Sequence, residues 1–132
     1  RRPLDVVSLD ELTPGLEREH EFEVDGPLLT DVGGTIGTSV LSTPGMIAMM
    51  ERTAAMLVYE HMPEGSATVG FEICVKHVAA AGQGARCTAK VTLREVVDDR
   101  KLRFDVEVRE GERTIGVGTH ERRVIKVPGA GG

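Results

Sequence analysis

The feature that most constrains the fold is one long apolar segment that is followed by alternating segments and by no second helix. Ser42 and Thr43 precede Pro44, and a hydroxyl residue before Pro is typical of a helix start. Apolar residues then cover almost the whole circumference up to Val58, and Pro and Gly within 63–65 end the helix. The pattern predicts a helix that is buried on several sides.

Alternating segments before and after this helix are typical of strands. They cover residues 16–24, 68–78, 85–97, 102–109 and 114–127. Short turns join the last of these segments, so no helix lies between them to make a parallel crossover. We therefore expect an α+β fold in which an antiparallel sheet of about five strands wraps around the helix. One chain of this kind leaves free sheet edges, which a dimer can pair.

The length of 132 residues predicts a single domain over residues 1–132, with a disordered tail at 128–132. A hydrophobic content of 40% and a charged content of 28% are typical of a soluble globular protein, and no segment has the roughly 20 apolar residues of a membrane span. The net charge of -5 and the scattered aromatic residues disfavour nucleic-acid binding. We expect no membrane and no nucleic-acid partner.

Two cysteines, Cys74 and Cys87, are too few for a disulfide framework, and both lie in predicted strands among apolar residues. We expect buried, reduced thiols and a cytoplasmic protein. The start of the chain does not resemble a secretory signal, although removal of residues before Arg1 stays open because the chain does not begin with Met. No His or Cys spacing matches a metal site, so we expect no metal.

Glu51 is the most informative polar residue. Its neighbours three and four positions away on the predicted helix are all apolar: Ile47, Ala48, Ala54 and Ala55. A buried carboxylate is costly unless it is paired or neutralised, which makes an inward Glu51 a candidate site residue. The alternative is that Glu51 turns toward Arg52 or solvent.

His77 is a second candidate because it ends the apolar face of the strand at 68–78. That predicted face carries Val69, Phe71, Ile73 and Val75. A histidine at the end of such a face can transfer protons in a site, or it can be a satisfied structural residue. The other histidines, at positions 20, 61 and 120, are weaker candidates.

Thr43 is predicted to cap the helix, and it can also present its hydroxyl and nearby free amides to a developing negative charge. Eight residues separate Thr43 from Glu51, which is about 12 Å along a helix at 1.5 Å per residue. We expect the two side chains to lie at opposite ends of one pocket, without a direct hydrogen bond.

Together these residues resemble the fluoroacetyl-CoA thioesterase family of hot-dog proteins. The resemblance is carried by Ser42-Thr43-Pro44-Gly45-Met46, Met50-Glu51, Gly70-x-x-Ile73-Cys74-Val75-x-His77 and Gly118-Thr119-His120-Glu121-Arg122. It implies a hot-dog fold, a homodimer or higher homo-oligomer with active sites near the subunit interface, and a catalytic set of Thr43, Glu51 and His77. It also implies that Gly70 lines the acyl pocket and that Arg122 supports the site or contacts the ligand.

The segment 28–39 is rich in glycine and has no aromatic residue to close a fluoroacetyl-selective pocket. The segment therefore gives no sign of selectivity for a fluorinated substrate. The resemblance and the small residues near its motifs imply a thioesterase for short or small acyl-CoA substrates, with coenzyme A as part of the substrate and no separate cofactor. Glu51 or Thr43 would attack or orient water, and His77 would transfer protons. Covalent and water attack stay open, as does the subunit that supplies each residue. The alternatives are a hot-dog hydratase or dehydratase and a noncatalytic acyl-CoA binding module.

Overall fold

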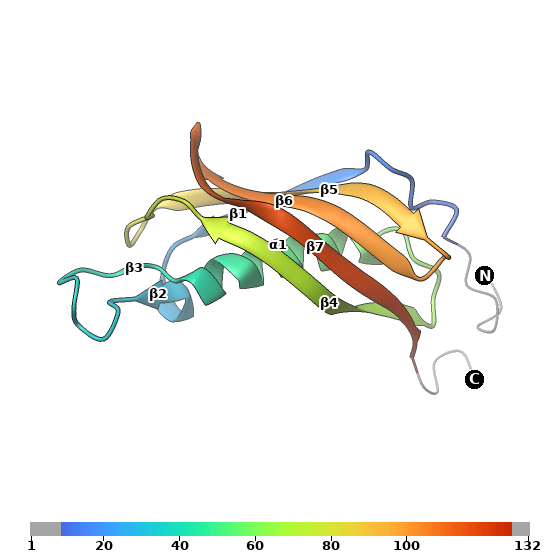
Figure 1. The fold of residues 1–132 in the computed structure, drawn as a ribbon, viewed down its shortest axis with the longest axis horizontal. Coiled ribbons are helices and arrows are strands. Elements are labelled where there is room, and N and C mark those ends of the chain that lie inside the picture. Colours follow the sequence, from blue (N-terminus) through green and yellow to red (C-terminus); the bar gives the residue numbers. More distant parts are fainter. Residues whose placement is uncertain (1–8, 128–132) are drawn as a thin grey trace.

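A five-stranded antiparallel sheet, a small two-stranded sheet of β2 and β3, and one long helix are the main elements of the computed structural model, which describes residues 9–127 (Figure 1). The elements, in chain order, are β1 (Glu17–Glu23), η1 (Gly26–Leu28), β2 (Leu29–Thr30), β3 (Val40–Leu41), α1 (Thr43–Tyr59), β4 (Ser66–His77), β5 (Arg86–Val97), β6 (Lys101–Glu110) and β7 (Arg113–Lys126). The predicted α+β arrangement is confirmed. The predicted tail at 128–132 lies outside the described residues.

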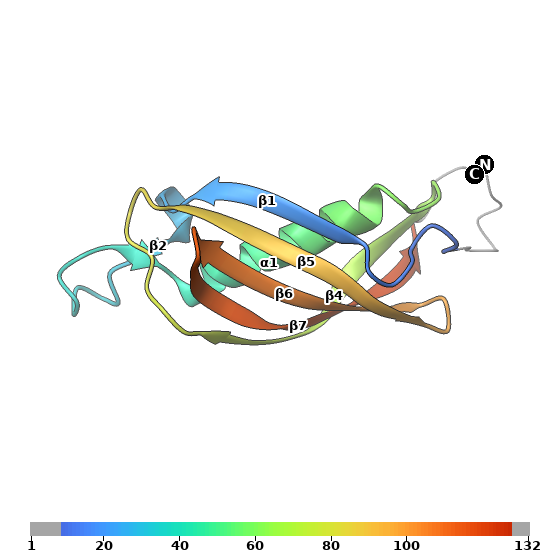
Figure 2. The same cartoon turned by 90° about the horizontal axis from the view of Figure 1, so that it is seen from above.

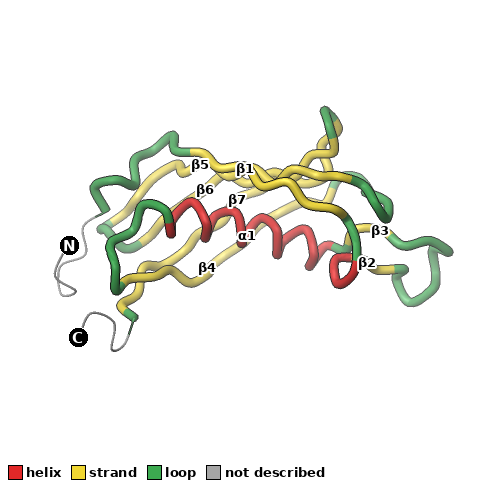
Figure 3. Tube along the Cα trace, turned by 180° about the vertical axis from the view of Figure 1, so that it is seen from behind, coloured by secondary structure: helices red, strands yellow, loops and turns green. Residues whose placement is uncertain are grey.

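The strand order in the sheet is β1-β5-β6-β7-β4, so β1 and β4 form its two edges. Hairpins join β5 to β6 and β6 to β7, as the short predicted turns require (Figure 2). The first of these turns contains Asp98 and Asp99 at φ 56° and 50°, a conformation that Asp tolerates better than most residues. Figure 3 shows α1 lying along one face of the sheet, with β4 below it.

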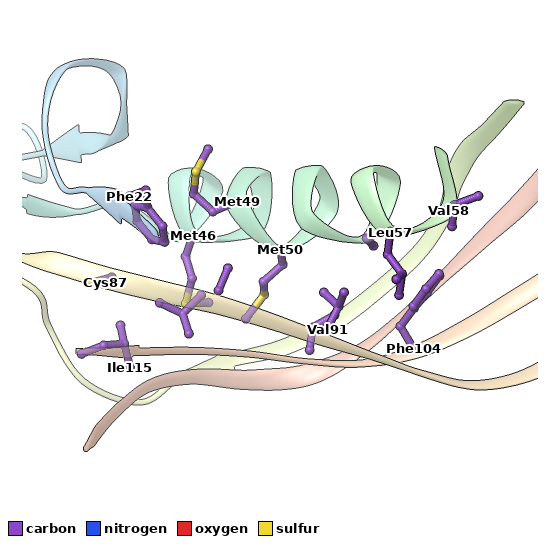
Figure 4. Packing of buried hydrophobic residues seen from close by; sticks show 14 of the residues in the cluster. Phe22, Met46, Met49, Met50, Leu57, Val58, Cys87, Val91, Phe104 and Ile115 are labelled. Atoms are coloured by element: carbon purple, nitrogen blue, oxygen red, sulfur yellow. The ribbon is translucent and has the colours of Figure 1, made fainter. Parts of the chain in front are cut away.

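The core lies between this face of the sheet and one side of α1. Met46, Met50 and Leu57 of the helix are fully buried and point at sheet residues such as Val91 and Phe104 (Figure 4). The opposite side of the helix, which includes Ala48, Arg52 and Tyr59, is exposed. The buried residues of α1 nevertheless cover more than half of its circumference, so the prediction of a helix buried on several sides is confirmed except for this exposed strip. Among the described residues, no helix is long and apolar enough to cross a membrane.

The cap residue of the helix lies one position earlier than predicted. Ser42, not Thr43, is the N-cap, and its Oγ accepts a hydrogen bond of 2.9 Å from the backbone N–H of Gly45. Thr43 is the first helical residue, so its hydroxyl is free for another partner. A Cβ at position 45 would stand 3.0 Å from the carbonyl oxygen of Leu28. Glycine at this position therefore lets Leu28 pack closely against the start of the helix.

A β-bulge in β4 changes which side chains face the helix. The register with β7 shifts between Gly70 and Glu72, and a bulge inverts the alternation that follows it. Ile73 and Val75 pack on the core, whereas Val69 and Phe71 are 46% and 59% exposed. The prediction that these four residues share one face was therefore wrong. Cys74 is also exposed, contrary to prediction, whereas Cys87 is buried as predicted.

Candidate active site

Thr43 and His77 form the first part of the candidate site. Thr43 stands in the first turn of α1, His77 ends β4, and a hydrogen bond of 2.8 Å joins Thr43 Oγ1 to His77 Nδ1. The other ring nitrogen, His77 Nε2, is buried and has no hydrogen-bond partner within the described residues. Buried polar atoms are nearly always paired in folded proteins, so an unpaired imidazole nitrogen beside a hydroxyl indicates a functional position.

Glu51 lies further along α1, above the middle of β4. It lines a shallow pocket of about 170 Å³ together with Gly70, Phe71, Glu72, Ile73 and His120. Gly70 makes room for the carboxylate, because a Cβ at this position would stand only 2.7 Å from Glu51 Oε2. The side chain is half-buried and turned toward the sheet, as predicted, rather than toward Arg52 and solvent.

His120 is the histidine beside Glu51. Its Nδ1–H donates to the carbonyl oxygen of Glu72 at 2.8 Å, and its ring stacks on Phe104 with centroids 6.0 Å apart. Only 3% of the residue is exposed. Burial lowers the pKa of His120 and is the largest effect. The hydrogen bond to the Glu72 carbonyl opposes it, and of the smaller effects the charge of Arg122 lowers the pKa and the carboxylate of Glu51 raises it. The imidazole is therefore held in its neutral form at neutral pH.

Arg122 lies beneath the same pocket and is 7% exposed. Its Nε donates to Thr68 Oγ1 at 2.8 Å, its Nη2 to the carbonyl oxygen of Thr68 at 3.0 Å, and its Nη1 to His120 Nε2 at 3.3 Å. Burial lowers the pKa of Arg122, and the carboxylate of Glu51 raises it. This geometry favours support of the site over contact with ligand, the two roles that the sequence left open.

The predicted site residues therefore fall into two groups along one seam between α1 and β4. Thr43 and His77 lie at one end. Gly70, Glu51 and Arg122 lie near the middle, so Glu51 is separated from Thr43 as predicted, but the pocket that Glu51 lines does not include Thr43, contrary to the prediction of one shared pocket. Within the described part of the chain, no hydrogen bond links Glu51 to His77 or to Thr43. A single chain thus holds two partial sites rather than one joined set.

From the sequence, His120 was a weaker candidate than His77, and Thr68 was not identified as a site residue. The available signal was the spacing of His120 and Arg122, because residues two apart on a strand share a face. Charged residues on both faces of this strand hid that signal. No cluster of three or more His, Cys, Asp or Glu side chains suited to a metal ion occurs among residues 9–127.

Known proteins are similar in sequence to this chain. The model of the fluoroacetyl-CoA-specific thioesterase family matches residues 28–128. A fluoroacetyl-CoA thioesterase from Streptantibioticus cattleyicolor is 36% identical over 86 residues, which are 65% of this chain and 61% of that protein. The chain thus matches less than two thirds of the length of that curated relative.

Solved structures show the same fold. The structure of a fluoroacetyl-CoA thioesterase is 29% identical, covers 88% of this chain and 90% of its own, and superimposes with a TM-score of 0.78. A mutant of such an enzyme in complex with fluoroacetate and CoA is 28% identical, covers 87% and 96% of the two chains, and has a TM-score of 0.79. A hot-dog-like protein from Thermanaerovibrio acidaminovorans, at 21% identity over 89% and 86% of the chains, has a TM-score of 0.81 and supports the fold alone. The predicted hot-dog fold is confirmed.

Proposed function

Because the chain belongs to the fluoroacetyl-CoA-specific thioesterase family, we propose that it is an acyl-CoA thioesterase that hydrolyses a short acyl thioester to the free acid and CoA. The observation that carries the proposal is the seam between α1 and β4. It holds a hydroxyl hydrogen-bonded to an imidazole at one end and a carboxylate over a glycine near its middle. These are the residue types that the family resemblance implies for catalysis.

Thr43 and His77 are suited to nucleophile delivery and proton transfer. A thiolate leaves readily because thiols have a pKa near 8.5, so the harder tasks are attack on the carbonyl and stabilisation of the oxyanion. The imidazole can take the Thr43 proton through Nδ1, which lies 2.8 Å from the hydroxyl oxygen. The start of α1 presents the positive end of the helix dipole to an oxyanion nearby, although the amides of Gly45 and Met46 already donate to Ser42.

Glu51 supplies the anion of the site. Its carboxylate can attack the carbonyl and form an anhydride, or it can orient a water for direct attack. Both routes leave the same products and use the same residues. The small pocket of about 170 Å³ beside Glu51 supports a short acyl group, and the absence of aromatic residues from 31–39 gives no support for selection of a fluorinated one.

We propose further that the enzyme is a homodimer that pairs through β4. Within the described residues β4 pairs only with β7, so its other edge is open. Antiparallel pairing of this edge with a second copy brings the His77 end of one strand alongside the half of the other that carries Thr68 and Gly70. The two partial sites would then join across the interface. Light scattering tests the assembly, and a monomer at micromolar concentration would contradict it.

A cytoplasmic location is part of this proposal. It rests on the presence of only two cysteines, which are too few for the disulfide framework of a small secreted domain. We also expect no bound cofactor, since coenzyme A arrives as part of the substrate.

A thiol-release assay over acetyl-, fluoroacetyl-, branched, aromatic and long-chain acyl-CoAs tests the reaction and the acyl preference together. We expect fast release from short substrates and loss of release in Glu51→Gln. Glu60→Gln is the matched control, because Glu60 lies at the end of the same helix and its carboxylate pairs with Arg18 on the surface. Acyl-CoA binding without thiol release would indicate a binding module instead. Hydration of an unsaturated acyl-CoA without thiol release would indicate a hydratase.

A further inference from the structure

Three side chains converge above Gly70 from two different elements. A Cβ at Gly70 would stand 2.7 Å from Glu51 Oε2, 3.6 Å from His120 Cε1 and 3.8 Å from Arg122 Nη1. Glu51 comes from α1, whereas His120 and Arg122 come from β7. The helix therefore presents a carboxylate to a histidine and an arginine that the sheet holds in place, and the glycine leaves the space between them open.

The hydrogen bonds of His120 make its second ring nitrogen, Nε2, an acceptor. A carbonyl oxygen can only accept, so the proton is on Nδ1, which donates to Glu72. In the neutral ring Nε2 then carries a lone pair, and the atom 3.3 Å away is the donor Nη1 of Arg122. If the ring were protonated, Nε2–H would be a donor that faces the donor Nη1 of Arg122. The contact exists only while His120 is neutral.

Thr68 and His120 between them hold all three nitrogens of the Arg122 guanidinium. Thr68 accepts from Nε and Nη2, and His120 accepts from Nη1. An arginine and a carboxylate that approach freely tend to form a bidentate pair, which would occupy both carboxylate oxygens. Within the described residues the carboxylate of Glu51 makes no such bond, although its charge acts on Arg122.

We propose that His120 is a positioning residue of this site, which as a neutral acceptor holds Arg122 back from a bidentate pair with Glu51. The inference rests on the proposed thioesterase function. Arg122 contributes a nearby positive charge, while both oxygens of Glu51 stay available to water or substrate. Without the acceptor at Nε2, the guanidinium turns toward Glu51 and blocks it.

Two substitutions separate the two nitrogens of His120. Asn can keep a donor for the Glu72 carbonyl but does not reach the Nε2 position, whereas Gln can place its amide oxygen near Nε2 and accept from Arg122. We expect His120→Asn to lower kcat by about 30-fold with KM within about twofold, and His120→Gln to retain kcat within about fivefold. Equal losses in both variants, or no loss in either, would overturn the proposal.

The pH profile gives a readout that a purely structural role would not move. The groups that face the His120 ring are Glu51 of α1, the Glu72 carbonyl of β4, Phe104 of β6 and Arg122 of β7. Protonation of His120 on the acid side sets Nε2 against Arg122, so the wild type should lose activity there. His120→Gln should lack this part of the decline, and an unchanged profile would contradict the proposal.

His61→Asn is the matched control, because the Nδ1 of His61 also donates to a backbone carbonyl, that of Leu57, away from Glu51. We expect it to leave kcat unchanged. Nitrogen NMR of the wild type tests the contact without any substitution: Nε2 of His120 should be unprotonated at neutral pH, and a protonated Nε2 would overturn the proposal. A wild type that releases no thiol would instead refute the proposed function, and the NMR result would still decide the His120–Arg122 contact.

Discussion

An arginine and a carboxylate lie near each other at both faces of β7, but they are paired on one face and not on the other. On the outer face, Glu121 Oε1 accepts from Arg103 at 3.0 Å and Oε2 accepts from Arg123 at 2.6 Å. On the inner face, the Arg122 guanidinium is held by neutral partners, and the carboxylate of Glu51 near it makes no hydrogen bond within the described residues. Glu121 is thus saturated, and Glu51 is left free.

The difference separates a structural carboxylate from a candidate catalytic one. Burial would raise the pKa of Glu121, but the hydrogen bonds and charges of Arg123 and Arg103 outweigh it, so the pKa is lowered. Arg123 in turn covers the ring of Phe71 at 3.5 Å from its centroid. The charged groups on the outer face are engaged with one another or with Phe71. On the inner face, the carboxylate of Glu51 remains available to act as a nucleophile or a base.

The largest expected effect comes from exchanging the two carboxylates for amides. Glu51→Gln should lower turnover by at least about 1000-fold, because an amide can neither attack nor act as a base. Its thermal midpoint should hold or rise, since a neutral amide avoids the cost of a half-buried charge. Glu121→Gln should do the reverse, with a midpoint lower by a few degrees and turnover within about threefold.

Thiol release and thermal unfolding on both purified variants check this contrast. Normal turnover in a folded Glu51→Gln protein would remove Glu51 from the mechanism. Loss of turnover in Glu121→Gln without loss of stability would show that the outer face also takes part in catalysis.

A second contrast uses two glycines that lie against different kinds of atom. Gly70→Ala forces Glu51 Oε2 away from a Cβ that would stand 2.7 Å from it, and a carboxylate end can move. We expect turnover to fall about 10- to 100-fold with little change in stability. Gly118→Ala would bring a Cβ against the backbone carbonyl of Cys74, which cannot move without disturbing the sheet. It should destabilise the fold by about 1–3 kcal/mol.

Turnover and denaturant unfolding of these two variants measure the contrast. If Gly70→Ala lost stability and kept turnover, the position of Glu51 above Gly70 would have no catalytic meaning. If Gly118→Ala were as stable as the wild type, the two glycines would not differ in the way that their contacts indicate.

Most of the fold was predictable because hydrophobic periodicity and turn residues act locally. The helix at 43–58, the five strands and the hairpins at 98–99 and 110–111 all follow from such patterns. The bulge at Phe71 was not predictable, since it depends on how β4 pairs with a strand some 50 residues away. It also explains why Val69 and Phe71 lie on the face that the alternation did not assign to them.

The candidate site was predictable in part for the same reason. An inward Glu51 follows from the apolar residues around it on the helix, and its distance from Thr43 follows from helix geometry. The pairing of Thr43 with His77 and the convergence of His120 and Arg122 on Glu51 both depend on contacts between elements. The cap residue is Ser42 and not the predicted Thr43. Both residues offer a hydroxyl, and only the backbone conformation decides which of them caps the helix.

The smallest expected effect is the dependence of the free energy of unfolding on pH. The inner and outer faces of β7 should differ in the pH range over which each loses stability. The folded pKa of His120 lies below its ordinary value of 6.5, so the neutral ring stabilises the fold fully above that pH. This contribution is lost as the pH falls from about 6.5 through the lowered pKa, because the unfolded chain takes up the proton first. The folded pKa of Glu121 lies below 4.5, so its contribution is present above that value and is lost only in stronger acid.

Urea unfolding between pH 3 and pH 8 can resolve the two windows when each variant is compared with the wild type. The wild type should lose stability relative to His120→Gln as the pH falls below about 6.5, since Gln does not titrate. Relative to Glu121→Gln it should lose stability only below about 4.5, where the carboxylate is protonated and releases Arg103 and Arg123. A His120→Gln protein that followed the wild type through the upper window would mean that the buried histidine is not held neutral, and the inner face would then not differ from the outer one in the way proposed.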